Sequence, residues 1–486
     1  MRQFETCQPR LGETSIADIV FDPKSRDDVP QLLRGLQFLY VTPALRAEVF
    51  RILDQVIAPK ISRRTGRPGM TLWRILVLGV VRLNLGWDYD RLQEMANQHR
   101  TLRQMLEHGA DDETHYELQT LKDNVSLLTP EILDQINQVV VHAGQQLAKK
   151  KGDDEVQGRC DSFVVETDVH YPTDANLLVD ALRKIIVLSA RVSRRYGLAG
   201  WGKSGYNLRQ VRRWLRAVQQ GKSPRRPKET RRAYRRYLAL ARDLIQRGEE
   251  TVAQLPAAAV DAGEEIGRYL AHAHRQVEQI DRRVLQGQTI PHAEKVFSLF
   301  EEHTEWISKG KAGVPVELGV QVAIVEDQYG FILHHRVMQG EGDAAIAVPL
   351  VRETQQRFPQ LHQCSFDRGF YTPDNRTQLR SLLTVSALPS RGTPSASEAA
   401  WEASEEFLTA RRRHVAVESA INALEVHGLD RCPDHGIAGF RRYVALAVVG
   451  RNIQQLGAWV SYQAALARRR RRPRRTADPP SCRRAA

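Results

Sequence analysis

VPVELGVQVAIVED (314–327) and FILHHRVMQ (331–339) are two runs of apolar and β-branched residues, joined through Gln328-Tyr329-Gly330. Runs of this composition on either side of a short glycine-containing connection are typical of a β-hairpin. We therefore expect two antiparallel strands at this point of the chain.

Downstream of the hairpin, helical and strand patterns alternate. A helix is expected to begin after Gly342, with Asp343 as its cap, and a later one has Pro373 near its start. The expected elements are a helix over DAAIAVPLVRETQQRF (343–358), a strand HQCSF (362–366) ending at Asp367, a helix TPDNRTQLRSLL (372–383), a strand TVSALPS (384–390), a loop over 391–404, and helices over 405–426 and 437–467.

Upstream, DSFVVETDVHY (161–171) is rich in β-branched and aromatic residues and predicts a strand. A long helical stretch follows from about 175 to 295. Without that stretch, the order is three antiparallel strands and then parallel βα units. This is the order of a ribonuclease-H-like mixed α/β sheet with an insertion after its first strand.

The first 150 residues are predicted to be all helical. LWRILVLGVVRLNL (72–85) is apolar and of helix length, and Gly86 follows where a helix would stop. Two shorter helices are expected from Asp88 or Asp90 and around 102–106, after the basic stretch 60–68. Three short helices with tight connections suggest a helix-turn-helix, with a plain helical bundle as the alternative.

The predicted organisation is thus α/β with an all-α N-terminal domain. Its parts are a helical domain over 1–150, a catalytic core over 156–174 and 312–460, a basic helical insertion over 175–311, and a basic disordered tail over 461–486.

The composition favours a soluble protein that meets a polyanion. The net charge is +14 and 42% of residues are apolar, so the chain can bury a core. No run of 18 apolar residues predicts a membrane span, and MRQFETCQPRLGE (1–13) lacks the apolar core of a secretion signal. The five cysteines form no CxxC, which favours a reducing cytoplasm over a disulfide framework or zinc site.

The charge is concentrated between residues 209 and 236, where twelve Lys or Arg accompany one acid, with Trp214, Tyr234 and Tyr237 interleaved. Pro224 and Pro227 divide the segment, so we expect a helical hairpin. An ordinary solvated face mixes charge signs, so this imbalance favours a DNA-backbone surface. The arginines assigned to it are Arg209, Arg212, Arg213, Arg216, Arg225, Arg226, Arg231, Arg232, Arg235 and Arg236.

Three carboxylates occupy the places where a ribonuclease-H-like domain holds two divalent metals for phosphoryl transfer. Asp161 is expected to begin the first strand, Asp367 follows a strand and precedes Gly369, and Glu418 lies on a late helix. Mg²⁺ prefers carboxylates and water. Glu166 and Asp168 compete with Asp161, because strand periodicity does not choose among them. On the helix of Glu418, Arg411, His414 and Asn422 share its face, a stripe suited to phosphate contacts.

These blocks resemble those of ISNCY-type bacterial insertion-sequence transposases. DSFVVETDVHYPTDANLLVDALR (161–183) is similar to that family's first catalytic block, FDRGFYTPDNR (366–376) to the second, and RRRHVAVESAINALEVHGLDRC (411–432) to the third. FSLFEEHTEWISKGKAGVPVELG (297–319) and RRTGRPGMTLWRILVLGVVRLNLGWDYDRL (63–92) resemble the accompanying blocks.

The resemblance implies a DDE transposase that cleaves and joins DNA, with Asp161, Asp367 and Glu418 holding two Mg²⁺ ions, or Mn²⁺. It also implies double-stranded DNA partners at element ends and target, a homodimer on DNA, and a place at the bacterial nucleoid. The chain departs from the family at Ser162-Phe163, where two Thr are expected, and at Arg411, His414 and Glu425, where a related signature has Tyr, Arg and Lys. A nuclease without strand transfer and a non-catalytic DNA-binding derivative are the alternatives.

Overall fold

The computed structural model describes residues 12–22, 24–57, 69–149, 155–220, 227–308 and 316–471. The chain divides into two compact units, residues 1–166 with 320–486, and residues 167–319. In the described part, no helix is both long and apolar enough to cross a bilayer.

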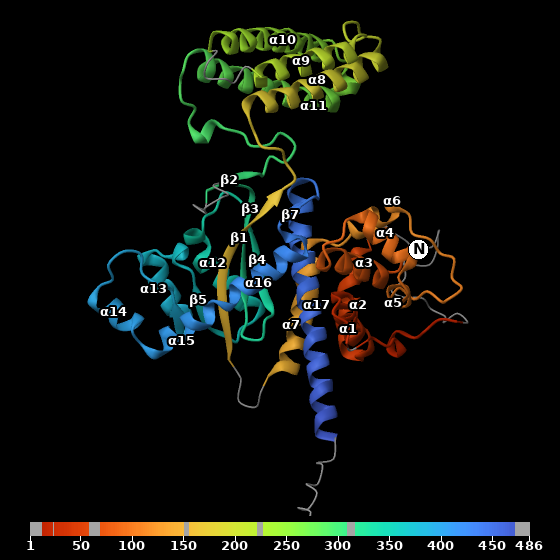
Figure 1. Ribbon diagram of the computed structural model, residues 1–486, viewed down its shortest axis with the longest axis vertical. Coiled ribbons are helices and arrows are strands. Elements are labelled where there is room, and N and C mark those ends of the chain that lie inside the picture. The colour runs from red at the N-terminus through yellow and green to blue at the C-terminus, as the bar shows by residue number, and fades with distance from the viewer. Residues whose placement is uncertain are drawn as a thin grey trace, which may run out of the picture. The chain divides into compact units, whose positions relative to one another are not determined.

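The first unit is built on a mixed sheet in the order β4-β3-β1-β5-β6 (Figure 1). The hairpin is confirmed, because β3 and β4 pair antiparallel, whereas β1 pairs parallel with β5 and β5 parallel with β6. Short β7 also pairs with β1. The strands are β1 (Val156–Thr167), β3 (Glu317–Glu326), β4 (Ile332–Met338), β5 (Leu361–Phe366), β6 (Val385–Ala387) and β7 (Arg431–Cys432).

Helices between and after these strands follow the predicted order. They are α12 (Asp343–Arg357), α13 (Pro373–Leu382), α14 (Ala396–Glu402), α15 (Glu405–His414), α16 (Ala416–Leu424) and α17 (Gly436–Arg471).

Three local predictions are wrong. The strand β1 starts at Val156, five residues early, because the alternation in Val156–Cys160 is hidden by Gly158, and this places Asp161 inside the strand. The predicted loop 391–404 contains α14, whose capping box of Ser395 and Glu398 was readable in the sequence. The predicted disordered tail begins too early, since α17 continues to Arg471; later residues lie outside the described ones.

The described residues before 150 are mostly helical, as expected. Thr71 and Asp88 cap α3 and α4 with their side chains, and Gly86 has a positive φ of 61° after α3. The helices are α1 (Asp28–Val41), α2 (Pro43–Leu53), α3 (Leu72–Asn84), α4 (Tyr89–Gln98), α5 (Arg100–Met105), α6 (Leu118–Val125) and α7 (Pro130–Ala148).

These helices share a hydrophobic core with the sheet and belong to the same compact unit. The predicted domain boundary at residue 150 is therefore not found. Helix α17 packs against α1, α3 and α7. Asn452 of α17 accepts from the Ile332 amide at 2.9 Å and donates to Asn137 of α7 at 2.7 Å, while Asn137 donates to the Ile332 carbonyl. These buried amides join α7 and α17 to β4, across long distances in the sequence.

The predicted helix-turn-helix stays a prediction. Helix α3 is almost wholly buried, and α4 exposes Asp90 and Glu94 beside Arg91, so its outer surface is not basic. The basic stretch 60–68 lies outside the described residues.

The second unit contains the predicted helical insertion and has its own core. Four helices pack together, α8 (Asp174–Tyr196), α9 (Ser204–Gln220), α10 (Pro227–Ala253) and α11 (Val260–Ile280) (Figure 1). Strand β2 (Glu305–Ile307) pairs with Glu317–Gly319 of β3.

Helices α1 and α17 cross with their backbones in contact at two glycines. A Cβ on Gly457 would lie 2.0 Å from the Gln31 carbonyl oxygen, and one on Gly35 would lie 2.0 Å from that of Ile453. We expect Gly457→Ala to destabilise the protein by about 3 kcal/mol, because the helices must separate. The free energy of unfolding is measured in urea, with Gly439→Ala as the control, since its Cβ would meet no atom closer than 3.4 Å. Equal midpoints for both variants would contradict this prediction.

Candidate active site

Two predicted carboxylates follow paired positions of neighbouring strands. Cys160 of β1 is in register with Phe366 of β5, and Asp161 and Asp367 come next. Asp367 keeps an extended backbone (φ −72°, ψ 161°). Because paired residues of parallel strands point to the same face and strands lie about 4.8 Å apart, the two carboxylates are expected to be neighbours. The sequence alone did not show this pairing.

Helix α15 is tied to the same face of the sheet. His414 Nδ1 lies 3.0 Å from the Ser365 hydroxyl, and Arg411 donates to the Phe366 carbonyl at 2.8 Å. Arg159 of β1 donates to the carbonyl of Arg413 at 3.4 Å. The C-terminal end of α15 is therefore bonded to the last residues of β5, directly before Asp367.

Glu418 lies one helical turn beyond His414. Between α15 and α16, Val415 keeps right-handed helical angles (φ −53°, ψ −26°), so the direction of the chain is largely preserved. Val417 and Ala420 are buried, whereas Glu418 is exposed. The Glu418 carboxylate therefore lies on the solvent-exposed side of α16.

Arg411 and His414, which were predicted to contact phosphate, form hydrogen bonds to β5 in the structure. His414 is 7% exposed, and burial, with Arg411 and Arg159 nearby, lowers its pKa to about 4 despite the attraction of Asp367. Its burial and lowered pKa favour the neutral form at pH 7, so its described role is the contact with Ser365. Arg411 holds a backbone carbonyl. Both residues position the helix of Glu418.

The rivals of Asp161 lie elsewhere. Glu166 is five residues further along β1, about 16 Å at the usual rise per residue, and its amide donates to the Asp430 carbonyl at 2.9 Å. Asp168 follows the strand and belongs to the second unit. Of the three candidates, the one in register with Asp367 is Asp161.

A further carboxylate, Asp343, approaches this part of the sheet. It accepts a 2.6 Å hydrogen bond from the Ser162 hydroxyl, 181 residues away in sequence. A Cβ on Gly369 would lie 2.7 Å from Asp343 Oδ2, so a larger residue there would displace the Asp343 carboxylate. The predicted capping role of Asp343 is wrong, because Gly342 is the N-cap and no side chain caps this helix. The sequence contains no signal for so distant a contact.

The donor set suits a hard divalent cation in part. Within the described residues, no three His, Cys, Asp or Glu side chains form a group that could hold a metal ion. However, Mg²⁺ is commonly held by one or two carboxylates together with water and substrate phosphates. Asp161 and Asp367 supply such an oxygen pair, with Glu418 on the adjoining helix. The residues fit Mg²⁺ bound together with DNA better than a preformed protein cage.

Arg159 connects this site to a buried acidic turn. Its Nη2 lies 3.1 Å from Glu326 Oε2, but it donates to the Asp327 carbonyl, so the contact with Glu326 is an ion pair without a hydrogen bond. Burial raises the pKa of Glu326 to about 7 against the attraction of Arg159, and that of Asp327 to about 6. Asp327 also accepts from Gln145 at 2.8 Å. A single arginine thus joins β1, the hairpin turn and α15.

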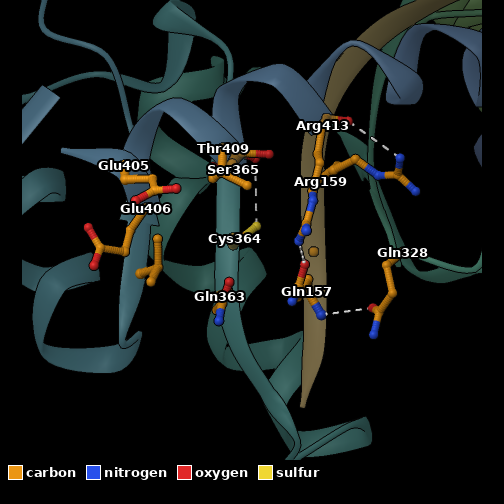
Figure 2. Close-up of a pocket in the computed structure, with 13 residues that line it drawn as sticks. Gln157, Arg159, Gln328, Gln363, Cys364, Ser365, Glu405, Glu406, Thr409 and Arg413 are labelled. Atoms are coloured by element: carbon orange, nitrogen blue, oxygen red, sulfur yellow. Dashed lines mark hydrogen bonds between the residues drawn. The ribbon is translucent and has the colours of Figure 1, made fainter. Parts of the chain in front are cut away.

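A cavity of about 460 Å³ lies between α15 and the first halves of β1 and β5 (Figure 2). Gln157, Gln363 and Arg413 line it, but none of the three predicted carboxylates does. Gln157 is bonded through its side chain to Arg413 and through its amide to Gln328 at 2.9 Å. The lining of the cavity reaches Arg159 and Ser365, each two residues before Asp161 or Asp367 in its strand.

The predicted DNA-binding arginines of the second unit lie on α9 and α10. Those within the described residues are all exposed. Arg225 and Arg226 lie outside the described residues. The interleaved aromatic residues point inward, since Tyr234 and Tyr237 are buried.

Comparisons of the chain with protein-family models, with curated proteins and with solved structures find no match.

Proposed function

We propose that this chain is a DDE-type DNA transposase that cleaves and joins DNA with Mg²⁺ at Asp161, Asp367 and Glu418. The observation that supports the proposal is the register of β1 and β5, in which Asp161 and Asp367 follow the paired residues Cys160 and Phe366, and α15, which leads to the helix of Glu418, is bonded to the same strand β5. Asp367 follows the carboxyl end of β5, where open α/β sheets bind their ligands.

The strand order supports a ribonuclease-H-like core. An antiparallel pair β3-β4 lies beside parallel β1, β5 and β6, in the order β4-β3-β1-β5-β6. The second unit begins at Thr167, the last residue of β1, and ends at Gly319, within β3. Both features agree with the expected core and its insertion.

Two bound Mg²⁺ ions, or Mn²⁺, would supply an activated hydroxyl and stabilise the leaving oxygen. The residues of the chain would hold the carboxylate oxygens in position for the metal ions. Ser162 donates its amide to Asp161 at 2.7 Å, and Arg411 and His414 fix the helix that leads to Glu418. Strand cleavage and strand transfer are both displacements at phosphorus, so one set of carboxylates serves both.

The partners proposed are double-stranded DNA at the element ends and at the target, with two copies of the chain assembled on DNA at the bacterial nucleoid. Phosphate contacts would fix the position of the DNA without reading its sequence.

The proposal is tested with labelled duplexes copied from the DNA on both sides of this reading frame. The full chain is incubated with each duplex, Mg²⁺ and a supercoiled plasmid, and a pre-cleaved duplex with a free 3′-hydroxyl is tested in parallel. We expect cleavage at one position on each side and covalent joining of the label to plasmid.

The outcomes separate the alternatives. Cleavage without joining, even from the pre-cleaved duplex, would identify a nuclease and overturn the transposase proposal. Binding of the duplexes with neither reaction in Mg²⁺ or Mn²⁺ would favour a non-catalytic DNA-binding derivative.

A further inference from the structure

Eight exposed arginines lie along α9 and α10 of the second unit, and we call them the arginine face. On each helix they recur at spacings of one, three and four residues, which places them on one side. Arg236 of α10 lies 5.5 Å from the ring of Trp214 on α9, so the two rows adjoin. The face consists of Arg209, Arg212, Arg213, Arg216, Arg231, Arg232, Arg235 and Arg236.

These arginines differ from six other arginines of the same bundle, which pair with carboxylates. Arg191 pairs with Glu265 at 3.8 Å, and Arg283 with Asp174 at 2.8 Å. Arg183, Arg242, Arg247 and Arg282 are paired in the same way. Among the described residues, no member of the arginine face forms an ion pair with a carboxylate. Its charge is therefore left for a partner outside the unit.

The aromatic residues of this segment serve the bundle instead of the surface. Tyr237 is fully buried and donates its hydroxyl to the Ala175 carbonyl at 3.1 Å, and Tyr234 is 4% exposed. Trp214 is half-buried, with Arg213 and Arg236 near its ring. Proteins that bind single strands stack bases on exposed aromatic rings. Over the described parts of α9 and α10 a single aromatic ring, that of Tyr206, is exposed, so there is no row of rings on which successive bases could stack, which favours a duplex.

An anionic membrane fits the face less well. Helices that lie on membranes bury an apolar side in the lipid. The apolar sides of α9 and α10 are used in the core of the bundle, through Val211, Val218, Leu238 and Leu244. Over the described parts of these two helices, Tyr206 is the one large apolar side chain that is exposed.

We propose that the arginine face binds the phosphate backbone of double-stranded DNA without reading base sequence. Guanidinium groups pair with phosphate oxygens in a two-pronged geometry, and a packed helix pair presents them in fixed rows. The choice of DNA among polyanions rests on the proposed function, but binding does not require catalysis. Charge that neutralises phosphates releases counterions, so affinity should fall steeply with salt.

The test uses the full-length chain carrying Asp367→Asn, which keeps DNA uncut. Binding to a labelled 30-base-pair duplex of arbitrary sequence is followed by fluorescence anisotropy at several salt concentrations. The test variant combines Arg212→Gln, Arg216→Gln, Arg231→Gln and Arg235→Gln. The control combines Arg183→Gln, Arg191→Gln, Arg242→Gln and Arg283→Gln, which removes the same net charge from ion-paired, exposed positions of the same bundle.

We expect the test variant to bind at least about tenfold more weakly at 100 mM salt, and its log–log salt slope to fall in magnitude by about 3 to 4. The control should change both quantities little. Equal losses in the two variants would overturn the proposal, because net charge alone would then explain binding. Tighter binding to a single strand, to duplex RNA or to vesicles containing anionic lipid would also overturn it. A chain that binds DNA as expected but never cleaves would leave this proposal standing while the catalytic one fails.

Discussion

Replacing Asp367 with Asn is expected to lower the rate of DNA cleavage by at least about a thousandfold, with little change in DNA binding. Asn keeps the shape of the side chain but removes one negative charge from the proposed metal site. A metal ion that stabilises the transition state contributes several kcal/mol, and each 1.36 kcal/mol corresponds to a tenfold change in rate. Asp161→Asn and Glu418→Gln should have comparable effects.

The double variant Asp161→Asn with Asp367→Asn should be little slower than either single variant, because residues that act as a unit are not additive. Glu166→Gln is the matched control, since this carboxylate lies on the same strand, five residues beyond Asp161. Cleavage is measured with the labelled flanking duplexes in Mg²⁺. If Glu166→Gln abolished cleavage and Asp161→Asn did not, the assignment of the first carboxylate would be wrong. If all of the variants cleaved at the wild-type rate, the whole site would be misplaced.

Arg159→Met is expected to lower the free energy of unfolding by about 3–5 kcal/mol at pH 8, since it leaves buried Glu326 without its cationic partner. It also removes hydrogen bonds to the carbonyls of Asp327 and Arg413. The hairpin turn and α15 would lose their common anchor, so cleavage should fall together with stability. Arg412→Met, at an exposed position of α15, is the control and should change stability little.

The stability loss in Arg159→Met should depend on pH. In the folded wild-type protein the pKa of Glu326 is raised from 4.5 to about 7. A carboxyl with a raised pKa binds a proton more tightly when folded, so its contribution to stability declines as pH rises from about 4.5 to about 7. Without Arg159 the pKa rises further, and the decline continues above pH 7. The loss should therefore be smaller at pH 5.5 than at pH 8, by at least about 1 kcal/mol. A loss that is equal at both pH values in urea titrations would rule out this account.

Local patterns were sufficient for most of the elements. The apolar runs that flank Gln328-Tyr329-Gly330 predicted β3 and β4. In the N-terminal region, Gly86 predicted the end of α3 and Asp88 the start of α4. These signals arise from neighbouring residues, through side-chain alternation, capping and turn chemistry. The same reasoning failed at Val156–Cys160, where polar side chains alternate with a glycine and hide a buried strand.

The sequence by itself determined the order of strands and helices, the helical insertion and the concentration of arginines on it, because these depend on local periodicity and charge. The tertiary structure decided which distant residues come together. It set the register in which Asp161 and Asp367 follow paired residues of neighbouring strands, brought Asp343 to Ser162, and buried His414 against Ser365. Those outcomes depend on strand register and burial, which arise from contacts between residues far apart in the chain.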